Sequence, residues 1–184
     1  IGLPPILAIG DEVMKRRIAP PVLAGDKRIS LAITEPSGGS DVAQLKTRAV
    51  REGGEYVVNG SKMFITGGMR ADYFTTAVRT GGPGMGGISL LLIEADRVGI
   101  SRTNLKKQGW WASDTAALYF QDVRVPVENL IGGEHMGFMG IMLNFNGERL
   151  GMASGACAYA RVCLEEAVKW ARERKTFGKR LADH

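Results

Sequence analysis

The sequence is poor in cysteine and histidine. Among its 184 residues are two cysteines, Cys157 and Cys163, and two histidines, His135 and His184. The cysteines lie six residues apart in a segment with helical periodicity, which puts them on different faces of a helix. We therefore expect two buried, reduced thiols rather than a disulfide. Neither histidines nor carboxylates cluster at ligand spacing, which argues against a metal site.

Long apolar runs are also absent. No run of 18 apolar residues occurs although such residues make up 45% of the chain, so the sequence predicts a globular protein without a membrane span. The first residues, Ile1-Gly2-Leu3-Pro4-Pro5, contain neither an initiator methionine nor the basic start of a signal peptide. We expect them to continue a segment that began earlier.

Charge is only modestly unbalanced, with a formal net charge of +5. Basic residues gather at 15–17 and 172–180, but aromatic residues do not alternate with them as in many nucleic-acid-binding proteins. Basic patches of this size fit small phosphorylated ligands equally well.

The periodicity of the sequence changes twice. Near the start, Asp11 can cap a helix from Glu12 to Ile18, which Pro20-Pro21 should end. From residue 28 to about residue 125 the period is two, and after Pro126 it returns to the helical value. These changes predict an α+β protein, in which an antiparallel β-sandwich or barrel is flanked by helices.

Short apolar runs separated by glycines predict the strands of the middle region. These runs are 29–34, 47–51, 55–58, 63–66, 73–79, 88–93 and 117–120. Asn59-Gly60, between two of the runs, predicts a two-residue hairpin with both residues at positive φ. The glycine-rich stretch 81–87 is interpreted as a surface linker rather than a phosphate cradle, because no Lys-Ser/Thr pair follows it.

A turn of unusual composition follows the first predicted strand. We call the segment Ile33-Thr34-Glu35-Pro36-Ser37-Gly38-Gly39-Ser40-Asp41 the hook. Pro36 fixes its own φ, the two glycines can adopt positive φ, and hydroxyl groups lie beside backbone N–H groups freed from strand pairing. Such a donor surface suits a phosphate or the polar edge of a ring. Most glycine-rich turns, however, are only turns.

The last third of the chain predicts helix. No proline occurs from Glu134 to Arg174, and apolar residues at helical spacing permit one long helix or two with a break near the glycines. Gly147, Gly151 and Gly155 share one face, which could accept either a neighbouring helix or a flat ligand.

Three motifs, in this order, resemble those of the acyl-CoA dehydrogenase family. They are the hook, Asn59-Gly60-Ser61-Lys62-Met63-Phe64-Ile65-Thr66 and Arg174-Lys175-Thr176-Phe177-Gly178-Lys179, supported by Ser113-Asp114-Thr115 and Phe120-Gln121-Asp122-Val123-Arg124-Val125-Pro126. The resemblance covers essentially all 184 residues, but only the middle of a family chain. It implies the end of an N-terminal helical domain (1–27), a central β-domain (28–132) and the first part of a C-terminal helical bundle (133–184), left incomplete.

The resemblance also implies noncovalent FAD, held between the β-domain and the C-terminal helices. The implied flavin contacts are Leu31, Ile33, Thr34, Gly39, Ser40, Phe64, Ile65, Thr66, Arg174, Thr176 and Phe177. The last three would reach the FAD of a neighbouring subunit, where the fixed fork of the Arg174 guanidinium suits the pyrophosphate. The family usually has tryptophan at the position of Phe64. A phenyl ring can still cover the flavin but lacks the indole N–H.

The implied reaction is the α,β-dehydrogenation of an acyl-CoA thioester. An exposed glutamate, with a pKa of about 4.3, is too weak a base to remove the α-proton, so the carboxylate must be held out of water. Glu148, directly before Arg149, resembles the base of isovaleryl-CoA and long-chain acyl-CoA dehydrogenases, and Ser40, Asn146 and Arg149 are the implied acyl-CoA contacts. Alternatively, Glu148 pairs with Arg149 or a lysine and the base lies beyond residue 184.

Helical geometry makes a further prediction about this segment. Neighbouring side chains diverge by roughly 100°. We therefore expect Glu148 to share a face with Asn144, and Arg149 to share one with Phe145.

The family further implies an electron-transfer flavoprotein as acceptor, a role in fatty acid β-oxidation, a homo-oligomer (dimer or tetramer), and a cytoplasmic or mitochondrial-matrix location. Three alternatives stay open at this point. The same fold could serve an acyl-CoA oxidase or a flavin monooxygenase, the chain could be a non-catalytic module, or it could be a plain β-sandwich that binds no flavin.

Overall fold

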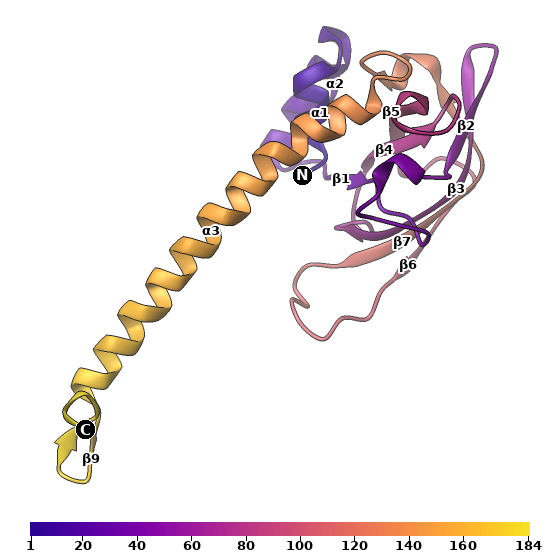
Figure 1. The fold of residues 1–184 in the computed structure, drawn as a ribbon. Helices are drawn as coiled ribbons and strands as arrows, with labels where there is room; N and C mark the ends of the chain where they lie inside the picture. The colour runs from indigo at the N-terminus through magenta and orange to yellow at the C-terminus, as the bar shows by residue number, and fades with distance from the viewer. The chain divides into compact units, whose positions relative to one another are not determined.

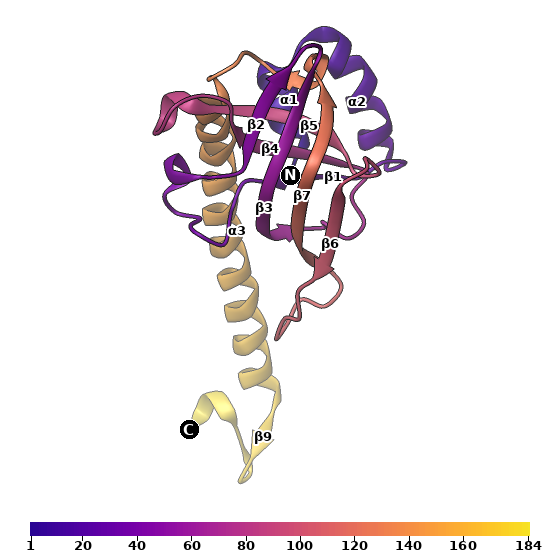
Figure 2. The same ribbon diagram turned by 90° about the vertical axis from the view of Figure 1, so that its right-hand side faces the viewer.

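The computed structural model describes all 184 residues, which form two compact units, Ile1–Leu143 and Asn144–His184. The chain is shown from two directions in Figures 1 and 2. The first unit contains helices α1 (Leu3–Ile9) and α2 (Glu12–Ala24) and a β-sheet. The long helix α3 (Gly137–Glu173) begins in the first unit and provides most of the second. No helix combines the length and apolar character that crossing a lipid bilayer requires.

The sheet of the first unit has eight strands in the order β6-β7-β3-β2-β4-β5-β8, with β1 paired to β4. The strands are β1 (Ile29–Ala32), β2 (Arg48–Glu52), β3 (Glu55–Thr66), β4 (Tyr73–Arg79), β5 (Ile88–Glu94), β6 (Ile100–Asn104), β7 (Thr115–Pro126) and β8 (Leu130–Ile131). Pairing is antiparallel except between β1 and β4 and at one position between β2 and β4. The predicted α+β class is confirmed, and the sheet does not close into a barrel.

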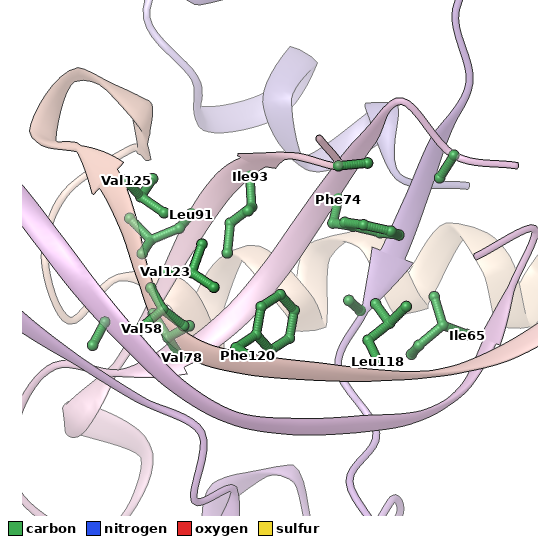
Figure 3. Packing of buried hydrophobic residues seen from close by; sticks show 14 of the residues in the cluster. Val58, Ile65, Phe74, Val78, Leu91, Ile93, Leu118, Phe120, Val123 and Val125 are labelled. Carbon is green, nitrogen blue, oxygen red and sulfur yellow. The ribbon is translucent and has the colours of Figure 1, made fainter. Parts of the chain in front are cut away.

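The core of the first unit lies where β3 and β7 face β4 and β5 (Figure 3). One side contributes Val58, Ile65, Leu118 and Phe120, and the other contributes Phe74, Val78, Leu91 and Ile93. All eight side chains are at most 2% exposed. Burial of each side chain stabilises the fold by about 1.5–3 kcal/mol. This packing holds β3 and β4 in place, and β1, which the hook follows, pairs with β4.

Asn59-Gly60 does not form the predicted hairpin. β3 continues through it, and its register against β7 shifts between Val58 and Gly60. The Asn59 Nδ2 donates to Asp122 Oδ1 and the Asp122 N–H donates to Asn59 Oδ1, both at 2.9 Å. The extra residue lies in β7, where Gln121 and Asp122 oppose Asn59 alone, so the dipeptide faces a β-bulge of β7. The hairpin lies at Gly53-Gly54, between β2 and β3.

Helix α2 does not end at Pro20-Pro21, as predicted. Asp11 caps its start as expected, but the helix continues past both prolines to Ala24. The prolines lie near the C-terminal end of the helix, where Pro20 is exposed and Pro21 half-buried, and carbonyl groups that lose an intrahelical partner there can bind water. The helix ends at Gly25, whose φ of +86° is the left-handed cap that glycine favours.

Some strands differ from the prediction in extent or were not predicted. β7 is twelve residues long, whereas only 117–120 was predicted, and β6 and β8 were missed. β6 has one apolar residue, Ile100, and forms through antiparallel main-chain pairing with β7. The glycine-rich stretch ends in one of four 3₁₀ turns. These turns are Val42–Gln44, Met85–Gly87, Val127–Asn129 and Leu181–Asp183.

The second unit consists of α3 from Asn144 onward and a short hairpin, β9 (Lys175–Thr176) with β10 (Lys179–Arg180). α3 is one helix without a break at its glycines, which decides between the two predicted alternatives. Cys157 and Cys163 are exposed, so the prediction of buried thiols is wrong here. The reason is that no other element of this unit covers the faces of α3 on which they lie.

Candidate functional site

The hook leaves β1 and turns back on itself at Pro36-Ser37. Glu35 and Gly38 exchange two backbone hydrogen bonds of 3.1 Å across this turn. Because the corner residues are proline and serine, neither Gly38 nor Gly39 adopts the positive φ that we considered for them. Gly39 is constrained differently: a Cβ atom there would lie 3.1 Å from Thr34 Cγ2.

Several donors of the hook have no partner within the chain. The backbone N–H groups of Thr34, Gly39 and Ser40 donate to no acceptor of the chain, and the hydroxyls of Thr34 and Ser40 form no hydrogen bond in it. Thr34 is half-buried, and residues 36–40 are exposed. The hook therefore offers a set of free polar groups, as its composition predicts.

The end of β3 lies beside β1 and the hook. The Met63 N–H donates to Thr34 O at 2.8 Å, and Ser30 Oγ donates to Thr66 O at 2.8 Å. The structure thus brings together two of the segments expected to contact flavin, 31–40 and 64–66. Ile33 and Ile65 are buried in the core, at 5% and 2% exposed, so they can offer a ligand little beyond their backbone.

Phe64 is both exposed and in an unfavourable backbone conformation. Its φ is +61°, at a second register shift between β3 and β7, and its side chain is 67% exposed. A left-handed conformation costs a residue with a side chain roughly 1–2 kcal/mol. An aromatic ring held outside the core at such a cost is a candidate ligand contact.

A buried ion pair lies beneath the hook, and sequence reasoning did not assign it to the site. Lys62 Nζ donates to Glu35 Oε1 at 2.8 Å and to Ile33 O at 3.0 Å. Burial lowers the pKa of Lys62 to about 8, against the opposing effect of Glu35. Burial alone would raise the pKa of Glu35, but the charge of Lys62 and hydrogen bonds to the carboxylate lower it. The sequence feature that could have identified this pair is Lys62, a lysine directly before the apolar residues 63–65 of β3.

Glu148 lies on α3 in the second unit. Asn144 Nδ2 donates to Glu148 Oε1 at 2.9 Å, and the carboxylate forms no ion pair. The Arg149 guanidinium lies 5.6 Å from the centre of the Phe145 ring and donates to Asn146 Oδ1 at 3.4 Å. The predicted sharing of helix faces is confirmed. Glu148 forms no ion pair with Arg149 or a lysine within the chain, and its role as the base stays a prediction.

The third family-like motif forms the hairpin after α3. Phe177 and Gly178 occupy its two-residue tip with φ of +49° and +79°, as a tight hairpin turn of this type requires. The Phe177 side chain is 96% exposed, and Arg174 is also exposed. Thr176 Oγ1 is 3.3 Å from His184 Nε2. The structure places these residues relative to one another within the second unit only.

The donor set of the hook fits a flavin dinucleotide. Free N–H groups at Thr34, Gly39 and Ser40 match the acceptor-rich edge of an isoalloxazine ring and a pyrophosphate, and exposed Phe64 offers an apolar ring face. No group of three or more histidine, cysteine or acidic side chains is placed to hold a metal ion.

Comparisons with known proteins agree with these features. Residues 30–123 match the family described as "Acyl-CoA dehydrogenase, middle domain", and residues 135–184 match "Acyl-CoA dehydrogenase, C-terminal domain". The chain is 45% identical over 184 residues to acyl-CoA dehydrogenase AFT10-1 of Alternaria alternata, covering all of this chain and 43% of the relative. It is 42% identical over 175 residues to mitochondrial isobutyryl-CoA dehydrogenase of Bos taurus, covering 95% and 42%.

Solved structures of acyl-CoA dehydrogenases are also similar to this chain. A crystal structure described as a probable acyl CoA dehydrogenase from Mycobacterium abscessus superposes with a TM-score of 0.97 at 55% identity. That match covers all of this chain and 49% of the solved one. The chain therefore spans less than half the length of each of these three proteins.

Proposed function

This chain belongs to the acyl-CoA dehydrogenase family, and we propose that it contributes the β-domain and the first part of the C-terminal domain to an FAD-dependent acyl-CoA dehydrogenase. The reaction converts an acyl-CoA thioester to the trans-2-enoyl-CoA. The domain limits that we propose are 1–27, 28–132 and 133–184. Support comes from the two matched domain families and from the free donors of the hook.

We assign the flavin to two segments of the first unit. Thr34 would donate to the ring, Gly39 and Ser40 to the pyrophosphate, and Phe64 would cover the ring face. Leu31, Ile33, Ile65 and Thr66 would complete the lining, with Ile33 and Ile65 acting through their backbone because their side chains are buried. Arg174, Thr176 and Phe177 would serve the flavin of a neighbouring subunit, which agrees with the exposure of Arg174 and Phe177.

We assign the α-proton to Glu148. Its carboxylate accepts the proton next to the thioester, and the Asn144 amide holds one carboxylate oxygen so that the other is free to do so. Bound FAD supplies the acceptor for the β-hydrogen, which leaves as hydride. Ser40, Asn146 and Arg149 would bind the acyl-CoA. The 3.4 Å hydrogen bond from Arg149 to Asn146 keeps the last two together.

Family membership supports further proposals about the electron acceptor, the pathway, the oligomeric state and the location of the enzyme. We propose an electron-transfer flavoprotein as the physiological acceptor, a role in fatty acid β-oxidation, a dimeric or tetrameric enzyme, and a location in the bacterial cytoplasm or the mitochondrial matrix. The mitochondrial relative from cattle supports the last alternative.

The observation that carries the proposal is the unpartnered donor set of the hook beside Phe64. The test is an absorbance spectrum of the purified holoenzyme before and after anaerobic addition of a panel of acyl-CoAs. We expect a visible flavin band that is bleached by at least one acyl-CoA. A colourless protein without affinity for FAD would overturn the proposal. Rapid consumption of oxygen without an electron-transfer flavoprotein would instead assign an acyl-CoA oxidase.

A further inference from the structure

The ion pair between Glu35 and Lys62 is buried beneath the hook. The two side chains are 4% and 0% exposed, and Nζ lies 2.8 Å from Oε1. A buried ion pair is often no more stabilising than apolar side chains of the same volume, because both charges lose their hydration. Its presence under the hook therefore suggests a role besides stability.

The pair joins the hook to the segment that follows it and to β3. The Glu35 carboxylate also accepts hydrogen bonds from the backbone N–H groups of Lys46, at 2.6 Å, and Thr47, at 2.9 Å. Lys62 Nζ, on β3, also donates to Ile33 O at 3.0 Å. The hook, the segment after it and β3 are thus held around one buried pair of charges.

These contacts determine the direction of one backbone donor. No peptide bond in the chain is cis, and in a trans peptide the carbonyl and N–H groups point in opposite directions. Because Ile33 O is directed to Lys62, the Thr34 N–H on the same peptide is directed away from it, and this N–H has no partner in the chain. The following carbonyl, Thr34 O, is held by the Met63 N–H at 2.8 Å.

We infer that Glu35 and Lys62 are positioning residues, which orient the Ile33–Thr34 peptide so that the Thr34 N–H donates to the flavin ring. The inference rests on the proposed function, because it assigns a flavin acceptor to that N–H. Opposite charges let Lys62 hold the carbonyl without leaving a net charge beside the ring. Glu35 holds Lys62 in turn, and is itself fixed by two backbone donors.

The double variant Glu35→Gln/Lys62→Met separates positioning from stability. It removes both buried charges and keeps similar volumes, so we expect a melting temperature close to that of the wild type. It also removes the donor to Ile33 O. We therefore expect the dissociation constant for FAD to rise about tenfold, the effect of one lost hydrogen bond, with a measurable shift of the flavin reduction potential in the holoenzyme.

A matched control is Leu91→Ala, which removes a fully buried side chain of β5. It should lower the melting temperature but leave the dissociation constant and the potential unchanged, when all proteins are measured well below their melting temperatures. If the double variant does not fold, Glu35→Gln/Lys62→Leu provides the same comparison, because it also removes the donor to Ile33 O and leaves no buried charge unpaired.

A variant lacking Lys62 that binds FAD with wild-type affinity and potential would overturn the inference and leave the pair a purely structural one. An equal loss of affinity in Leu91→Ala would also overturn it, because general destabilisation would then explain the effect. A wild-type protein that binds no FAD would overturn the proposed function itself, whatever the variants do.

Discussion

Gly60 and Thr47 are in direct backbone contact: a Cβ atom on Gly60 would lie 2.7 Å from both Cα and Oγ1 of Thr47. Thr47 Oγ1 donates to Ser61 O at 3.1 Å, and the Thr47 N–H donates to Glu35 Oε1. The absence of a side chain at residue 60 therefore lets the segment after the hook approach β3 closely.

Replacing Gly60 by alanine should lower the free energy of unfolding by about 2–4 kcal/mol, because the new methyl group meets Cα and Oγ1 of Thr47 and φ is +146°. Urea denaturation measures the change. Gly54→Ala is the matched control, since Gly54 has open space around its Cβ position and no positive φ. Equal effects of the two substitutions would contradict the importance of the Gly60–Thr47 contact.

Gly60 also lies where the sequence pattern predicts the wrong local structure. Asn-Gly between two apolar runs is a strong hairpin signal, yet β3 continues through it. Asn59 instead bonds to Asp122 in a bulge of β7, and the absence of a Cβ atom at Gly60 leaves room for Thr47. Both partners are distant in sequence, so no local pattern could identify them. Strand β4, in contrast, was predicted with its observed limits because its apolar pattern and flanking turns are local.

The candidate site was predictable in part. Family-like motifs identified the hook and Phe64–Thr66, and the structure places these segments side by side. The Glu35–Lys62 pair was missed, because whether Lys62 faces inward depends on the register shifts on either side of it. The exposure of Phe64 at positive φ also follows from such a shift, and composition does not reveal it.

Acid should weaken the fold through Glu35. The pKa of Glu35 is lowered in the folded protein from its usual 4.5. As the pH falls below 4.5, the unfolded chain therefore takes up a proton before the folded one does. The stabilisation by the Glu35 carboxylate is fully present above that pH, and is lost as the pH falls through the folded-state pKa.

Urea denaturation between pH 6 and pH 3, compared with Glu35→Gln/Lys62→Met so that no unpaired buried lysine titrates in the variant, measures this contribution. We expect a shallower loss of stability on acidification in the variant. The carboxyls of Asp72, Glu94 and Asp114, whose pKa values are also lowered, are common to both proteins and cancel in the difference. Equal changes of the free energy of unfolding with pH in the two proteins would contradict the assignment of this effect to Glu35.

Phe64→Leu should weaken flavin binding without harming the fold. The side chain is 67% exposed, so the free energy of unfolding should change by less than about 1 kcal/mol. Loss of the aromatic face should raise the dissociation constant for FAD roughly fivefold to tenfold. Fluorescence titration of the apoprotein measures it. Trp111→Leu, which alters an exposed aromatic residue between β6 and β7, should leave that constant unchanged. A wild-type dissociation constant for FAD in Phe64→Leu would show that Phe64 is not part of the proposed site.

The central claim is that Glu148 removes the α-proton of an acyl-CoA bound beside a flavin. Its most direct test is the rate at which acyl-CoA bleaches the flavin band of the holoenzyme, measured anaerobically by stopped flow for the wild type, Glu148→Gln and the exposed control Glu165→Gln. We predict equal FAD content in all three, a wild-type rate in Glu165→Gln, and a rate at least about a thousandfold lower in Glu148→Gln. A wild-type rate in Glu148→Gln would contradict the claim and place the base elsewhere.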